Sequence, residues 1–156
     1  MEFRNTGPKL SEETISAFEA HFQVTLPEDY RDFLLEHNGG RPEKNFCFDF
    51  VETGYQETES ILAEFFSMYD LEYDYSENLA TVFTNIRKDA FAPPYLMPIA
   101  YDDFGNLILL AVAGDDLGKV CFANHELTDP ATGYYVMSPV ADTFTEFIGK
   151  LYRYEE

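Results

Sequence analysis

Histidine and cysteine are the residue types most able to bind a metal ion or to attack a substrate. His21, His37 and His125 come from three separate parts of the chain, and none has another histidine or cysteine at metal-ligand spacing. Cys47 and Cys121 both lie in apolar stretches far apart in the sequence. We therefore expect two buried thiols, no disulfide, no metal and no cofactor.

The acidic residues, like the histidines and cysteines, show no pattern that is specific to a catalytic or metal site. The segment "DLEYDYSEN" (70–78) alternates acids as a calcium loop does, but its sixth position is Tyr75 instead of glycine and its twelfth is Thr81 instead of glutamate. The chain has no phosphate-binding loop, dinucleotide fingerprint or nucleophile elbow. We predict that the protein is not an enzyme. An acid-catalysed hydrolase stays open as an alternative, and it would need carboxylates that converge in a pocket.

The overall charge points to the kind of partner. The chain has 29 acidic and 10 basic residues, which gives a net charge of −19. Such a field repels nucleic acid and anionic lipid and attracts basic protein surfaces, although it can also serve solubility alone. No apolar run approaches the length of a membrane span, and the first residues contain no apolar leader. We expect a cytoplasmic protein with a basic protein partner, and we expect binding to neither nucleic acid nor membrane. The oligomeric state stays open.

Loop acids with nearby tyrosines are the candidate binding residues, because aromatic anchors supply contact area and carboxylates supply charge complementarity. They fall into two predicted clusters, in the segment 70–77 and in the turns after 101 and 114. The candidates are Asp70, Glu72, Tyr73, Asp74, Tyr75, Glu77, Tyr101, Asp102, Asp103, Asp115 and Asp116.

The elements that must position these residues follow from hydrophobic periodicity. Apolar residues at helical spacing predict helices over 11–22, 27–38, 76–88 and 142–153. Ser11 and Ser76 are the expected N-caps, and Pro27 suits the first helical position. The segment Asn38-Gly39-Gly40 should end the second helix with at least one residue at positive φ.

Alternating or continuous apolar runs predict strands over 45–50, 96–101, 107–113 and 119–124. The segment 58–69 is compatible with a helix or a strand, and 70–75 is a predicted loop. Helices first, a strand-rich middle and a final helix indicate one α+β domain over 1–156, with a mainly antiparallel sheet flanked by the N-terminal and C-terminal helices.

The amino-acid sequences of four segments resemble those of a known family. "LPEDYRDFLLEHNGG" (26–40) resembles the N-terminal signature of the SUKH superfamily, which includes the fungal Smi/Knr cell-wall regulators and many bacterial toxin-immunity proteins. "LMPIAYDDFGNLILLAV" (96–112), "GKVCFANHE" (118–126) and "VADTFTEFIGKL" (140–151) are similar to later segments of that superfamily, in the same order. The resemblance favours a strand over a helix for 64–69.

This resemblance implies a single-domain binding protein. The expected function is that of an immunity protein, which neutralises a cognate polymorphic toxin by stoichiometric binding. A nuclease is one candidate toxin, because its basic active site would suit the charge of −19. The alternative is a regulatory or scaffold protein similar to the fungal relatives. The matching residues themselves identify a fold and not a site.

Overall fold

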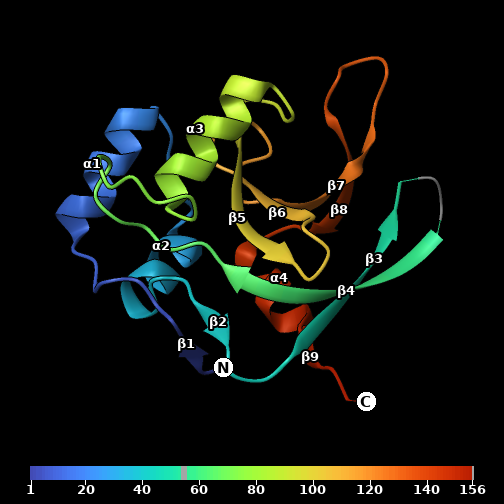
Figure 1. Cartoon of the computed structure of the whole chain (residues 1–156), viewed down its shortest axis with the longest axis horizontal. Helices are drawn as coiled ribbons and strands as arrows, with labels where there is room; N and C mark the ends of the chain where they lie inside the picture. Colours follow the sequence, from blue (N-terminus) through green and yellow to red (C-terminus); the bar gives the residue numbers. More distant parts are fainter. Residues whose placement is uncertain (54–55, 156) are drawn as a thin grey trace.

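A seven-stranded antiparallel sheet with the strand order β8-β7-β6-β5-β4-β3-β9 forms the centre of the computed structural model, which describes residues 1–53 and 56–155 (Figure 1). Its strands are β3 (Phe46–Glu52), β4 (Gln56–Phe65), β5 (Leu96–Asp102), β6 (Leu107–Ala111), β7 (Val120–Thr128), β8 (Tyr135–Ala141) and β9 (Tyr152–Arg153). A second, small sheet pairs β1 (Phe3–Arg4) with β2 (Arg41–Pro42). The predicted α+β class is confirmed, and 58–65 belongs to a strand.

The described residues contain four helices: α1 (Glu12–Phe22), α2 (Glu28–Glu36), α3 (Leu79–Asp89) and α4 (Phe144–Lys150). None of these helices is both long and apolar enough to cross a membrane. Ser11 caps α1 as predicted, since its hydroxyl accepts the Thr14 N–H at 3.2 Å. Pro27, however, occupies the N-cap of α2 instead of its first turn.

Two predicted helix ends were wrong. The N-cap of α3 is Asn78, not Ser76, because the Asn78 side chain accepts the Ala80 N–H at 3.3 Å. The last helix ends at Lys150 and does not reach 153. Residues 152 and 153 instead form β9, which pairs with Cys47 and Phe46 at the start of β3. Pairing there satisfies backbone groups at the sheet edge, which a longer helix would leave open.

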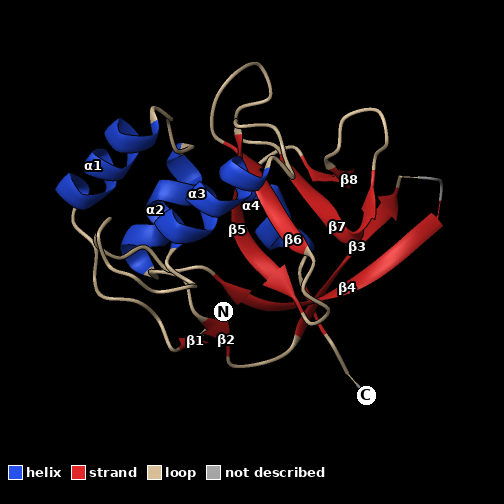
Figure 2. Ribbon diagram, turned by 45° about the horizontal axis from the view of Figure 1, so that its top comes forward, coloured by secondary structure: helices blue, strands red, loops and turns tan. Residues whose placement is uncertain are grey.

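The sheet curls so strongly that β3 lies against β8, although they stand far apart in the strand order. The Thr53 N–H donates to Ser138 Oγ at 2.8 Å and links the two strands beyond the end of β3. Helix α4 fills the inside of the curl, where Phe147 meets Phe48 at a ring distance of 5.3 Å. Figure 2 shows α1, α2 and α3 gathered at one end of the sheet, while the β3–β4 hairpin extends from the other.

Positive φ occurs after α2 as predicted, but it does not close the helix. The helix ends at Glu36, and its C-cap His37 has extended backbone angles. Gly39 (φ +67°) and Gly40 (φ +107°) then turn the chain toward β2. Asn38, which is buried, holds this turn through bonds from its side-chain amide to Pro8 O at 2.7 Å and Met68 O at 2.8 Å.

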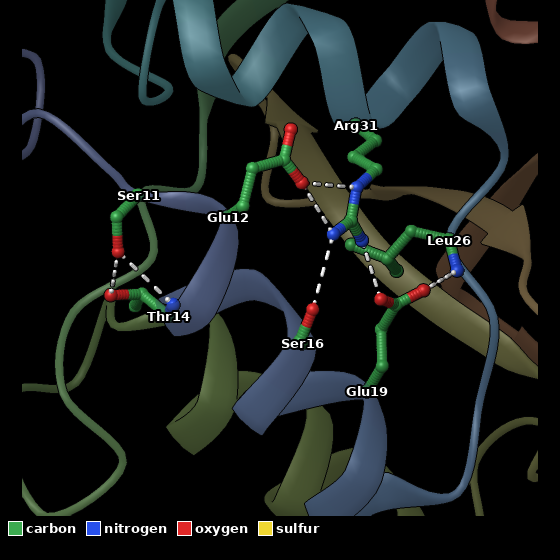
Figure 3. A network of polar contacts seen from close by, with 7 residues as sticks. All are labelled: Ser11, Glu12, Thr14, Ser16, Glu19, Leu26 and Arg31. Carbon is green, nitrogen blue, oxygen red and sulfur yellow. Dashed lines mark hydrogen bonds and ion pairs between the residues drawn. The ribbon is translucent and has the colours of Figure 1, made fainter.

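Arg31 is a charged residue of this segment with a structural role. Arg31 of α2 reaches across to α1, where its guanidinium binds Glu12 at 2.7 Å and Glu19 at 2.5 Å (Figure 3). Glu19 in turn accepts the Leu26 N–H at 2.8 Å. The network therefore fixes the packing of α2 on α1 and the loop between them.

Candidate protein-binding surface

The segment 69–77 connects β4 to α3 and contains the densest group of predicted binding residues. It lacks helix and strand, yet its shape is set by one buried side chain. The Asn78 amide donates to Asp70 O and Tyr73 O, both at 3.1 Å, and its oxygen accepts the Tyr69 N–H at 3.2 Å. These bonds tie the start and the middle of the loop to the start of α3. The loop is consequently ordered without a partner.

Tyrosine rings cluster on this loop. The ring of Tyr69 lies 5.1 Å from that of Tyr73 and 5.5 Å from that of Tyr75, and the latter two are 5.8 Å apart. Tyr73 exposes 51% of its surface. Asp70, Glu72 and Asp74 alternate with these rings and are exposed as well. The loop thus presents apolar ring surface and negative charge together, the combination that we predicted for 70–77.

Tyr101 joins the loop from the neighbouring strand β5. Its hydroxyl lies 2.7 Å from Glu64 Oε2 and 3.2 Å from Glu77 Oε1, while the Tyr75 hydroxyl donates to Glu77 Oε2 at 3.0 Å. Burial, followed by the hydrogen bond to Glu64, raises the pKa of Tyr101 well above its ordinary value. Two carboxylates therefore share the proton of one hydroxyl.

Glu64 was absent from the predicted site. Simple alternation along β4 would place it on the buried side, together with Ser60 and Leu62. A register shift between Leu62 and Glu64 turns it outward instead, opposite Tyr101. A carboxylate in an otherwise apolar run, "ILAEFF", was the only signal of this irregularity in the sequence.

Asp102 does not belong to the exposed surface, although the sequence placed it there. Only 2% of it is exposed. Its carboxylate accepts the N–H groups of Phe104 and Asn106 at 3.0 and 2.8 Å and the hydroxyl of Ser60 at 2.8 Å. It is a turn-forming residue whose buried charge is compensated by hydrogen bonds, so we leave it out of the binding surface.

The other predicted acids do not form one cluster. Asp103 precedes β6, and Asp115 and Asp116 follow it, so the two turns lie at opposite ends of a five-residue strand. That separation is roughly 17 Å. Asp103 lies beside β4, where its N–H donates to Ile61 O at 3.0 Å. Asp116 forms an ion pair with Lys119, whose Nζ lies 3.1 Å from Asp116 Oδ1.

The residues that could have carried metal or thiol chemistry stay apart. Residues 1–53 and 56–155 contain no group of three or more histidines, cysteines or acids arranged to hold a metal ion. His21 lies in α1 and His37 follows α2, whereas His125 lies in β7, 2.7 Å from the Asn106 side chain. Cys47 and Cys121 are free thiols, and Cys47 is buried as predicted, whereas Cys121 is only half-buried. Burial raises the pKa of Cys121 to about 12, which keeps this thiol protonated at neutral pH.

Comparison with known proteins relates the chain to a protein family and to a bacterial relative. A family model described as "SMI1 / KNR4 family (SUKH-1)" matches residues 9–150. The SPbeta prophage-derived uncharacterized protein YokK of Bacillus subtilis (strain 168) is 28% identical over 160 residues, in an alignment that covers 94% of this chain and 74% of YokK. No solved structure matches the sequence.

Proposed function

Because the chain belongs to the SMI1 / KNR4 family (SUKH-1), we propose that it is an immunity protein, which neutralises a cognate toxin domain by stoichiometric binding in the cytoplasm of the cell that produces it. The toxin domain has a basic surface, as a nuclease has around its active site. Binding blocks that surface, and it requires no catalytic residue in this chain. Similarity to a prophage-derived protein supports the same class of function.

The observation that carries the proposal is the ordered loop 69–77, with its exposed tyrosines and with the carboxylates of Asp70, Glu72 and Asp74, which are exposed and belong to none of the ion pairs of the described residues. Asn78 holds the loop in one shape, so little conformational entropy is lost when a partner binds. Tyr73 and Tyr75 supply the rigid aromatic area that is typical of binding hot spots. The loop therefore has the features of a preorganised interface.

The charges of the loop point to a basic partner. Within the described part of the chain, the acids that form ion pairs are Glu12, Glu19, Glu36 and Asp116. None of the loop acids is among them, so the fold neutralises none of these charges by an ion pair. Free carboxylates around an aromatic centre would speed association with a cationic surface and reject anionic competitors.

The test is growth rescue by co-expression with toxin domains that are encoded beside the gene. The wild-type protein should restore growth and form a one-to-one complex. If the protein fails to restore growth against every toxin domain encoded beside its gene, the immunity function is contradicted. The regulatory or scaffold role then remains.

Matched charge reversals then locate the binding surface. The pair Glu72→Lys/Asp74→Lys should slow association with the toxin domain by about tenfold or more at low salt. The control pair Asp115→Lys/Asp116→Lys changes the net charge equally at a distant turn, and it should leave association close to the parental rate. If both pairs behave alike, the loop is not the interface.

A further inference from the structure

The β3–β4 hairpin has one bare face that no prediction from the sequence had identified. In the register of the two strands, Asp49 stands opposite Glu59 and Val51 opposite Glu57. All four side chains are exposed, and Val51 exposes 55% of its surface. Strand β9 pairs with only the first two residues of β3, and α1, α2 and α3 lie at the other end of the sheet (Figures 1 and 2). Beyond β9, this outward side of β3 and β4 is therefore a sheet face that no other element of residues 1–53 and 56–155 covers.

A tyrosine stands between two carboxylates here, as Tyr101 does near the loop. The Tyr152 hydroxyl lies 2.7 Å from Asp49 Oδ1 and 2.5 Å from Glu59 Oε2. These hydrogen bonds raise the pKa of Tyr152 above its ordinary value. The hydroxyl has one proton for two acceptors, and the ion pairs of the described residues include neither carboxylate.

This arrangement contributes little to the stability of the fold. Like charges directly opposite each other on neighbouring strands are destabilising, and an exposed tyrosine hydroxyl compensates them only partly. Acids can also protect a sheet edge against aggregation. That role does not require Glu57 and Glu59, because β4 is an inner strand between β3 and β5.

The bare face continues into the loop surface. Ser60 and Asp102 bond to each other on the buried side of β4 and β5 at 2.8 Å. Side chains alternate between the two faces of a strand, so the next residues, Glu59 and Tyr101, must lie on the outward side. A line of carboxylates consequently runs along β4 from Glu57 to Glu64, with Asp103 at its side.

We propose that this outward face of β3, β4 and β9 docks an arginine- and lysine-rich surface of the partner protein and, together with the loop 69–77, forms one continuous interface. The proposal rests on the proposed function, since the partner is the same. Opposed side chains on adjacent strands are about 5 Å apart, so one guanidinium can bind both Asp49 and Glu59. Val51 and the turn residue Phe104, which is 74% exposed, supply apolar contact at the border.

The first test needs no toxin. A synthetic oligo-arginine peptide is titrated into the labelled protein, with a glycine-serine peptide of equal length as the neutral control, and amide shifts are recorded by NMR. The largest shifts should fall on residues 47–51, 57–61 and 152. They should disappear in Asp49→Lys/Glu59→Lys and persist in Asp115→Lys/Asp116→Lys. Shifts spread evenly over all acidic turns would overturn the proposal.

The variant Asp49→Lys/Glu59→Lys distinguishes a binding role of the two carboxylates from a structural role. The lysine pair still places like charges on opposite strands and still protects the edge, so the thermal midpoint and solubility should stay close to the parental values. A marked loss of stability in this variant would show that the carboxylates serve the fold, which contradicts the proposal.

The second test uses the toxin domain that the protein neutralises. Asp49→Lys/Glu59→Lys should slow its association by about tenfold or more at low salt and weaken growth rescue. Parental binding by this variant would reject the docking face and leave the immunity function intact. Conversely, if rescue fails for the wild type but the peptide maps to this face, the immunity function is wrong and the cation-binding face stands.

Discussion

The carboxylate of Asp29, in the first turn of α2, accepts two hydrogen bonds from Thr145 at the start of α4, one from the backbone N–H at 2.8 Å and one from the hydroxyl at 2.9 Å. The two residues are 116 positions apart. Thr143 is the N-cap of the same helix, through a bond from the Glu146 N–H at 3.0 Å. A carboxylate near the positive end of a helix dipole is favourable, so Asp29 positions the helix that fills the curled sheet.

This relationship makes Asp29→Ala a test of how α4 is held. The substitution should lower the free energy of unfolding by about 1–2 kcal/mol, because a charged acceptor is lost and a helix N-terminus is uncovered. Urea unfolding of Asp29→Ala, Thr145→Val and the double variant checks it. The double variant should be less destabilised than the sum of the single variants, and simple additivity would contradict the coupling.

Gly39 should tolerate a side chain much less well than other glycines with positive φ. An added Cβ would lie 2.6 Å from both Phe66 O and Ser67 Oγ, whereas the Cβ of an alanine at Gly114 would meet nothing within 4 Å. Both positions carry the backbone strain of about 1 kcal/mol, and only Gly39 adds a steric clash. Thermal unfolding should therefore show a larger loss for Gly39→Ala than for Gly114→Ala. Equal losses of stability would mean that the backbone around Phe66 can shift and make room for the added Cβ.

Tyr30→Phe should leave stability unchanged or raise it by about 1 kcal/mol. Tyr30 is 1% exposed, and its hydroxyl has no hydrogen-bond partner among the described residues. An unsatisfied buried hydroxyl costs free energy, and phenylalanine keeps the ring that packs on Phe144 at 5.1 Å. Urea unfolding measures the difference. A clear destabilisation would show that the hydroxyl is satisfied in solution, for example by a buried water.

Alkaline pH should weaken the fold through its buried tyrosines. The pKa of Tyr101 is raised in the folded protein, chiefly by burial, whereas in the unfolded chain it is about 10. Below about pH 10 both states keep the proton and this contribution to stability is complete. Above that pH the unfolded state loses its proton first, so the free energy of unfolding falls as pH rises toward the folded pKa.

Tyr101→Phe should make this alkaline decline less steep in urea titrations between about pH 9 and 11. Tyr95→Phe is the control, because Tyr95 is exposed and its hydroxyl has no carboxylate partner in the described part of the chain. An unchanged pH dependence in Tyr101→Phe would contradict the shared proton between Glu64 and Glu77.

Asn78→Ala should loosen the loop 69–77 and the first turn of α3, while the rest of that helix stays in place. The substitution removes an acceptor from the Tyr69 and Ala80 N–H groups and a donor from two carbonyl groups, at a cost of about 2 kcal/mol. Hydrogen exchange of the loop amides should accelerate, while the amides of 82–86 keep their protection. If the loop amides exchange at the parental rate, other contacts order the loop.

The helices and the central strands of this protein could be predicted from the sequence alone, whereas β8 (Tyr135–Ala141) was not predicted. Helical periodicity located α1 to α4, and alternation or apolar runs located β3, β5, β6 and β7. The Ser11 cap and the positive φ after α2 were also correct. These features depend on residues a few positions apart, where backbone geometry and the burial of one face decide the conformation.

Tertiary contacts decided the composition of the candidate surface. Asp102 is buried because Ser60, 42 positions earlier, supplies a hydrogen bond that compensates its charge. Glu64 is turned outward by a register shift on β4, which has no local signal strong enough to predict. The strand β9 and the pairing of Tyr152 with two carboxylates likewise require the far end of the chain. Because side-chain direction in a sheet alternates at every residue, one such shift reverses which acids face a partner.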